Sequence, residues 1–259
     1  MPPPRSYTGV VTAPTARPRR RRRVTVTGVI GELLITAGVV MLLYVAWQLW
    51  IGDVIYGAER NEQGSAMSQE WAQTEPAPPV TTPDPETGEE TFVPPVLEEP
   101  SDGERFGVMH VPRWGDDYMM PMAGGVSRPV TLDPIGIGHY PGTEMPGQIG
   151  NFALAGHRTT FGKPFADIAS LRVGDAIVIE TAEGWFTYRF RTLEYVRPDE
   201  VDVLLDVPQR PDVPANAAYI TLTACSPRFS LAERIVAYGI FDSFQPRAAG
   251  EPASLTEGA

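Results

Sequence analysis

The sequence of 259 residues predicts a mainly β domain that follows one transmembrane helix and a polar linker. A long apolar run, 24–51, has the length and composition of a membrane span. An acidic, proline-rich stretch, 52–103, separates this run from the rest of the chain. From 104 to 244, short apolar runs are punctuated by Gly and Pro, which is typical of a β-sandwich or barrel rather than of alternating strands and helices.

The composition excludes several classes of protein. The single cysteine, Cys225, allows no intramolecular disulfide and no cysteine-rich zinc site, and the three histidines are too scattered to indicate a metal cluster. The net charge of −11 argues against nucleic-acid binding, and eleven acidic residues with no basic ones lie within 61–104 alone. We therefore expect no metal, no cofactor and no nucleic-acid partner. The net negative charge is a property of the linker rather than of a binding surface.

The first 23 residues are rich in Pro, Thr and Arg, and we expect them to form a disordered basic tail. Five arginines, 19–23, directly precede the apolar run, so the positive-inside rule places the N-terminus in the cytoplasm. A cleaved signal peptide is the competing interpretation, but the run is longer than a signal's apolar region and no clear A-x-A site follows it. The sequence therefore predicts an uncleaved type II anchor over 24–51. Aromatic residues fit the membrane interface at its far end: Tyr44, Trp47 and Trp50.

The segment 52–103 carries too few apolar residues to offset the entropy lost on ordering. Its prolines and its mutually repelling carboxylates should keep it extended. We expect an extracellular stalk that holds the following domain away from the membrane.

The segment 104–244 is long enough for one hydrophobic core. The apolar residues Phe186, Tyr188 and Phe190 alternate with polar ones, which is the period of a half-buried strand. One short helix is expected at 163–171, and the tail 245–259 is expected to be flexible. Strands are expected at 106–111, 130–137, 152–155, 176–181, 185–191, 218–224 and 234–241.

Three residue types in this domain suit nucleophilic catalysis by a thiol. Cys225 ends an apolar strand, and a thiolate needs a base or cation beside it and donors for the oxyanion. His157 follows another apolar strand, and Arg234 begins a strand nine residues after Cys225. Taken singly, each has a structural interpretation: a small buried thiol, a hydrogen-bonded loop histidine and a surface arginine.

Taken together, these residues resemble the sortases, the membrane-anchored cysteine transpeptidases of Gram-positive cell walls. The segment 221–225 (TLTAC) is similar to the family's Thr-Leu-x-Thr-Cys strand, and 155–158 (AGHR) resembles its histidine motif. Arg234 falls where the family's arginine begins the next strand. The runs 138–143 (GHYPGT) and 150–160 (GNFALAGHRTT) are of the type found in class E sortases of high-GC actinobacteria.

The resemblance implies a closed eight-stranded β-barrel over 104–244, on the outer side of the cell membrane. Cys225 would be the nucleophile, His157 the proton donor and acceptor, and Arg234 the oxyanion or substrate donor. Substrate contacts are expected at Tyr140, which would select Ala in a Leu-Ala-x-Thr-Gly signal, and at Thr223 and Ala224. Position 224 departs from the family, where most members have Thr, and this puts a local contact beside the nucleophile in doubt.

The expected partners are secreted proteins with a C-terminal sorting signal and an amine of lipid II or of a peptidoglycan stem or cross-bridge. The enzyme is expected to be monomeric. Two alternatives stay open: a surface cysteine peptidase that uses the same three residues for hydrolysis, and a non-catalytic barrel that binds wall peptides.

Overall fold

The computed structural model describes residues 25–47, 52–76, 78–83 and 90–256. The chain divides into two units, one ending at Val45 and the other beginning at Ala46. Helix α1 (Val26–Ala46) belongs to the first unit, and among the described residues it is the one helix whose length and composition would allow it to cross a membrane. The expected basic tail, 1–23, and Trp50 lie outside the described residues.

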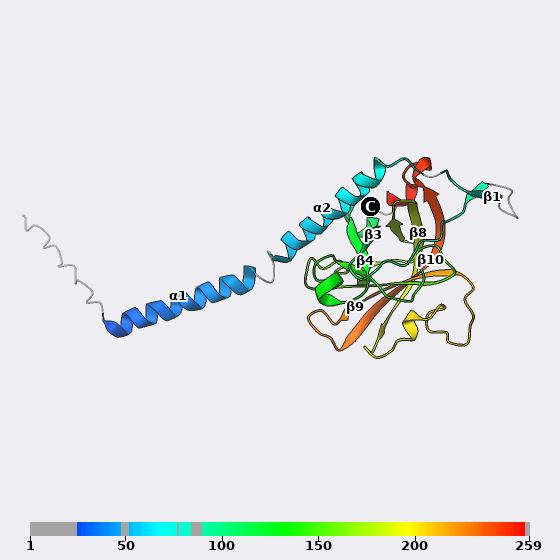
Figure 1. Ribbon diagram of the computed structural model, residues 1–259. Coiled ribbons are helices and arrows are strands. Elements are labelled where there is room, and N and C mark those ends of the chain that lie inside the picture. The colour runs from blue at the N-terminus through cyan, green and yellow to red at the C-terminus, as the bar shows by residue number, and fades with distance from the viewer. Residues whose placement is uncertain (1–24, 48–51, 77, 84–89, 257–259) are drawn as a thin grey trace, which may run out of the picture. The chain divides into compact units, whose positions relative to one another are not determined.

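Helix α2 (Gly52–Ala72) occupies the first part of the expected stalk. The sequence predicts an extended chain here, but the stretch 52–72 has no proline and contains three Ala, three Glu and two Gln, which favour a helix. One side of α2 packs on the barrel, where Arg60 is only 3% exposed. Figure 1 shows α2, in cyan, against the barrel wall beside β3 and β4. The segment after α2 contains two short paired strands, β1 (Thr81–Pro83) and β2 (Glu90–Phe92).

Eight strands of the second unit close into a barrel in the order β10-β8-β7-β3-β4-β5-β6-β9, as the resemblance implies. Two neighbouring pairs, β4 with β5 and β6 with β9, run parallel, and the other neighbours run antiparallel. The strands are β3 (Arg105–His110), β4 (Met120–Gly124), β5 (Ile137–His139), β6 (Gly150–Gly156), β7 (Ala176–Glu180), β8 (Gly184–Val196), β9 (Ala218–Ser226) and β10 (Glu233–Pro246). Short helical turns lie between the strands, namely η2 (Pro112–Trp114), η3 (Arg128–Leu132), η4 (Ile168–Ser170) and η5 (Asp202–Leu204). Two more follow β10: η6 (Arg247–Ala249) and η7 (Ala253–Leu255).

Within the barrel, one expected strand is wrong and one strand, β4, was missed, and outside it the short strands β1 and β2 were not expected. The run 130–137 forms the π-helical turn η3 and a loop, and only Ile137 at its end enters a strand, β5. The prolines at 129 and 134 explain this, because proline has no amide proton for a strand ladder. The missed strand is β4, whose own proline obscures its pattern. The expected helix at 163–171 is reduced to the 3-10 turn η4.

The barrel interior holds the main core, in which Phe152, Phe165, Phe186 and Tyr188 are the largest buried side chains. The C-terminal tail is more ordered than expected. Arg247 donates through Nη2 to Glu180 Oε1 at 2.8 Å, and both side chains are almost fully buried. Ser254 and Leu255 also contact β8 and β7, so the described part of the tail, 245–256, packs on the barrel instead of fraying.

Candidate active site

Cys225 lies near the end of β9, and its position is fixed by pairing with β10. In this antiparallel register Cys225 is directly opposite Arg234, and Thr223 is opposite Val236. Opposed residues of an antiparallel pair have Cβ atoms about 4.5–5.5 Å apart, so the thiol and the root of the guanidinium side chain are neighbours. The thiol is half-buried, which leaves it accessible from outside the barrel.

His157 reaches the same edge of the barrel through a different pairing. It directly follows β6, and β6 runs parallel to β9, with Ala155 beside Thr223. Parallel strands end on the same side of a sheet, so His157 and Cys225 leave the barrel at one edge. Gly156 is required here, because an added Cβ would lie 2.7 Å from the ring of Phe165.

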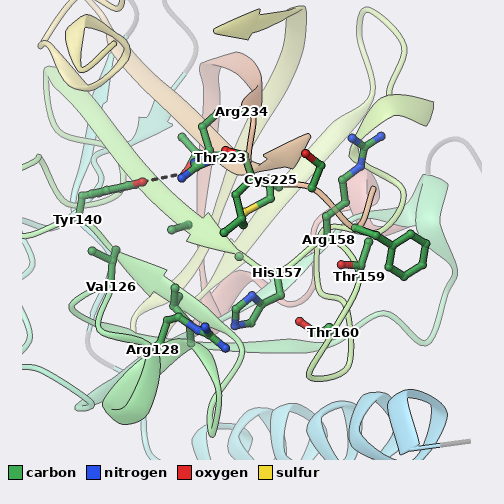
Figure 2. A pocket seen from close by; sticks show the side chains of 17 residues that line it. Val126, Arg128, Tyr140, His157, Arg158, Thr159, Thr160, Thr223, Cys225 and Arg234 are labelled. Atoms are coloured by element: carbon green, nitrogen blue, oxygen red, sulfur yellow. Dashed lines mark hydrogen bonds between the residues drawn. The ribbon is translucent and has the colours of Figure 1, made fainter. Parts of the chain in front are cut away.

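A groove of about 630 Å³ joins these residues, a size typical of ligand-binding pockets. Cys225, His157 and Arg234 line it together with Arg128 and Arg158, and no carboxylate is among its described lining residues. In Figure 2, Cys225 is seen between Arg234 and His157. In a chain of net charge −11, this concentration of cations favours a site where negative charge is bound or develops.

Tyr140 and Thr223 also line the groove, and the Tyr140 hydroxyl lies 3.0 Å from Thr223 Oγ1 (Figure 2). Ala224 is different. Although it borders the groove, it is 3% exposed and belongs to the main core together with Leu222. The strand alternation therefore separates Thr223 from Ala224, which faces the side chains of the barrel interior.

The imidazole of His157 is held from behind by a carboxylate. His157 Nε2 lies 2.7 Å from Asp133 Oδ1, and the two side chains are 14% and 24% exposed. Burial lowers the pKa of His157 below its ordinary value, while the hydrogen bond and charge of Asp133 oppose this and the charges of Arg128 and Arg60 add to it. Because Nε2 is engaged by Asp133, Nδ1 is the ring nitrogen left to exchange a proton with reacting groups.

Arg234 keeps donors available for a substrate. Its Nη1 donates to the carbonyl oxygens of Leu231 at 3.2 Å and Glu233 at 3.0 Å, and among the described residues it forms no other hydrogen bond. The contacts fix the guanidinium at the start of β10. Nη2 and Nε then remain to bind an oxygen beside Cys225.

Asp133 and Arg128 are site residues that the sequence analysis does not predict. The strand expected at 130–137 includes Asp133, whereas in the structure Asp133 follows η3 and forms an ion pair with Arg128 at 3.3 Å. The signal that could have located it is the dipeptide Asp133-Pro134, since Asp before Pro marks a turn rather than a strand. The other two histidines have structural contacts: His110 Nε2 lies 2.7 Å from Glu180 Oε2, and His139 is fully buried.

Comparison with known proteins identifies the same family that the motifs of this chain resemble. The sortase domain profile matches residues 109–241. Sortase SrtE1 of Streptomyces coelicolor is 34% identical over 258 residues, which cover 94% of this chain and 67% of that protein. Among solved structures, SrtA sortase from Actinomyces oris has a TM-score of 0.59 and 37% identity, covering 62% of this chain and 93% of its own. Sortase E1 from Streptomyces coelicolor, solved with a tripeptide in the active site, has a TM-score of 0.56 and 36% identity, covering 60% and 99%.

The chain therefore belongs to the sortase family of cysteine transpeptidases, and class E sortases are among its structural neighbours. This confirms the family, the barrel and the enzyme class that the motifs indicate. The roles of the individual site residues stay predictions.

Proposed function

We propose that this sortase cleaves a Leu-Ala-x-Thr-Gly or Leu-Pro-x-Thr-Gly sorting signal between Thr and Gly and joins the Thr carboxyl group to an amine of a cell-wall precursor. The observation that carries the proposal is the convergence of Cys225, Arg234 and His157 on one cation-lined groove. The tripeptide bound in the active site of Streptomyces coelicolor sortase E1 supports a peptide as the occupant of the equivalent groove here.

In the first half-reaction, the Cys225 thiolate attacks the carbonyl carbon of the Thr–Gly bond. Arg234 donates to the oxyanion that forms, which is where fixed donors contribute most. Imidazolium His157 then gives its proton to the glycine nitrogen as the C–N bond breaks. The products are a free glycine amine and a thioester between the Thr carbonyl and Cys225.

In the second half-reaction, the amine of lipid II or of a peptidoglycan stem or cross-bridge attacks the thioester. Neutral His157 takes the proton from the attacking nitrogen, and Cys225 leaves as the thiolate. The enzyme returns to its starting protonation state, and the net reaction exchanges one amide bond for another. Water in place of the amine would give the free acid, which is the peptidase outcome.

The sequence and α1 support a location for this reaction. We propose that α1 anchors the chain as a type II membrane protein with the barrel on the cell-wall side, because five arginines precede the apolar run. The partners would then be secreted proteins that carry a C-terminal sorting signal, and a monomer suffices because one chain supplies all three residues.

The test uses the full chain in detergent micelles with labelled Leu-Ala-x-Thr-Gly and Leu-Pro-x-Thr-Gly peptides and a glycine or diaminopimelate amine, with products identified by mass. An amine-linked product cut after Thr, absent with Cys225→Ala, is the expected result. Free acid as the sole product would instead establish a peptidase. Binding of the peptides without turnover by the folded protein would establish the non-catalytic alternative.

A further inference from the structure

Helix α2 is fitted to the barrel too closely to be a simple spacer. The Asn61 side chain accepts a hydrogen bond from the Met119 amide at 3.1 Å. At Gly64 an added Cβ would lie 2.1 Å from the Met119 carbonyl oxygen, so the two backbones are in contact. Farther along the helix, the Ser68 hydroxyl donates to Glu180 Oε1 at 2.7 Å, and Arg247 lies 5.3 Å above the Trp71 ring. These contacts fix the height and rotation of α2 on the barrel.

The N-terminal half of α2 reaches the residues that lie behind His157. The guanidinium of Arg60 donates through Nη2 to the backbone carbonyl oxygen of Asp133. Asp133 in turn places Oδ1 2.7 Å from His157 Nε2. One hydrogen-bonded chain therefore runs from α2 to the imidazole, between residues that are 73 and 24 positions apart in the sequence.

Aromatic contacts form a second connection between α2 and the imidazole. The ring of Tyr56 lies 6.3 Å from that of Phe161, and Phe161 lies 5.3 Å from the imidazole of His157. The next residue, Gly162, has φ 77°, and an added Cβ would lie 3.1 Å from the backbone nitrogen of Gly57. The loop that carries Phe161 is thus packed directly on the helix backbone.

The electrostatics indicate that Arg60 has a positioning role. A buried arginine is costly, and the charge of Arg60 also lowers the pKa of His157, which opposes the imidazolium that the proposed reaction needs. An apolar side chain would pack the helix without this penalty. What it would not supply is the hydrogen bond that holds the main chain of Asp133.

We propose that α2 is the supporting wall of the active site and that Arg60 and Tyr56 are positioning residues, which hold Asp133 and Phe161 so that these hold His157. The role of His157 in catalysis rests on the proposed function. The positioning itself is a property of the resting protein and can be measured without a substrate.

The experiment follows the three histidines of the full chain in detergent micelles by 13Cε1 labelling and NMR, with His157→Gln assigning the His157 signal. The pKa of His157 is then compared in wild type, Arg60→Met and Arg60→Lys. Besides Arg60, the charged groups near the imidazole are Asp133 and Arg128, with Cys225, Arg158 and Arg234 along the groove. All of these stay unchanged in the two variants.

The two explanations of Arg60 predict opposite signs. If Arg60 holds Asp133 in place, Arg60→Met loosens the Asp133–His157 hydrogen bond and the pKa of His157 falls, with Arg60→Lys closer to wild type. If Arg60 acts only as a nearby positive charge, its removal raises the pKa of His157, and the inference is overturned. Methionine fills a buried site of this length, so the variant should fold.

Gly64→Ala tests the helix rather than the arginine, because its methyl group must lift α2 from Met119. It should lower the pKa of His157 in the same direction as Arg60→Met. The matched controls on the same helix are Glu62→Ala, on its exposed side, and Ser68→Ala, which loosens the contact with Glu180 instead. An equal shift in Ser68→Ala, or none in Gly64→Ala, would contradict a specific support of His157.

Activity gives a second readout once turnover is established. Arg60→Met should reduce kcat with little change in KM, by between about 3-fold and 100-fold, the larger value being what a misplacement of about 1 Å can cause. A wild-type protein that turns over neither peptide would refute the proposed function, yet the NMR titration would still decide the role of α2.

Discussion

Replacing Asp133 by asparagine tests how the protonation of His157 is controlled. Asparagine keeps the shape of the side chain and an acceptor oxygen, so the substitution removes the charge but preserves the contact at 2.7 Å. The negative charge of Asp133 raises the pKa of His157 against the effect of burial. The pKa of His157 should therefore fall in Asp133→Asn. At any pH above that pKa, the variant should then contain less imidazolium than the wild type.

The size of the effect follows from the geometry. A hydrogen bond to a charged group contributes about 1.5–3 kcal/mol, and the 24% exposure of Asp133 favours the lower end through solvent screening. Since about 1.4 kcal/mol corresponds to a factor of ten in rate, kcat/KM should fall by about tenfold above the pKa of His157. Well below that pKa the imidazolium forms without help, and the variant should approach the wild-type rate.

The assay is the pH dependence of kcat/KM for amine-linked product formation. The limb on which activity falls with rising pH should move to lower pH in Asp133→Asn. Asp167→Asn is the control, because it removes the same formal charge at a different place. Asp167 is an exposed carboxylate 3.6 Å from Arg228. A loss that is equal at all pH values, or a limb that moves to higher pH, would refute the assignment of Asp133 to the protonation of His157.

Three further substitutions test the groove. Arg234→Lys keeps the charge but loses the planar guanidinium, so kcat should fall about 10- to 100-fold, and a wild-type rate would return Arg234 to a structural role. Tyr140→Phe removes the hydroxyl that lies 3.0 Å from Thr223 Oγ1 and should lower kcat/KM for Leu-Ala-x-Thr-Gly relative to that for Leu-Pro-x-Thr-Gly by about 2- to 10-fold. Ala224→Thr adds bulk to a core position that is 3% exposed and should lower the free energy of unfolding by about 1–3 kcal/mol in denaturant titrations. An unchanged midpoint there would mean that the barrel has room for the threonine found in most of the family.

Local signals in the sequence predict Cys225 and Arg234, whereas His157 is linked to them by a resemblance to a known family. Cys225 is expected at the end of one strand and Arg234 at the start of the next, and the antiparallel register pairs these two residues directly. His157 is 68 positions from Cys225, and no periodicity relates the two. The resemblance to a family made this link, and the parallel pairing of β6 with β9 is its physical basis.

The elements behind the groove could not be predicted from local signals, because they become ordered through contacts with residues that are far away in the sequence. A polar segment such as 52–103 is expected to be extended when it must bury its own apolar surface to become ordered. Helix α2 instead docks through glycine contacts and hydrogen bonds, and its partner Glu180 lies 112 positions from Ser68. The tail is ordered for the same reason, since Arg247 pairs with that carboxylate. A fragment beginning at 104 would keep every motif residue of the groove and lose the helix that supports His157, so the motifs define the chemistry without defining the smallest chain that performs it well.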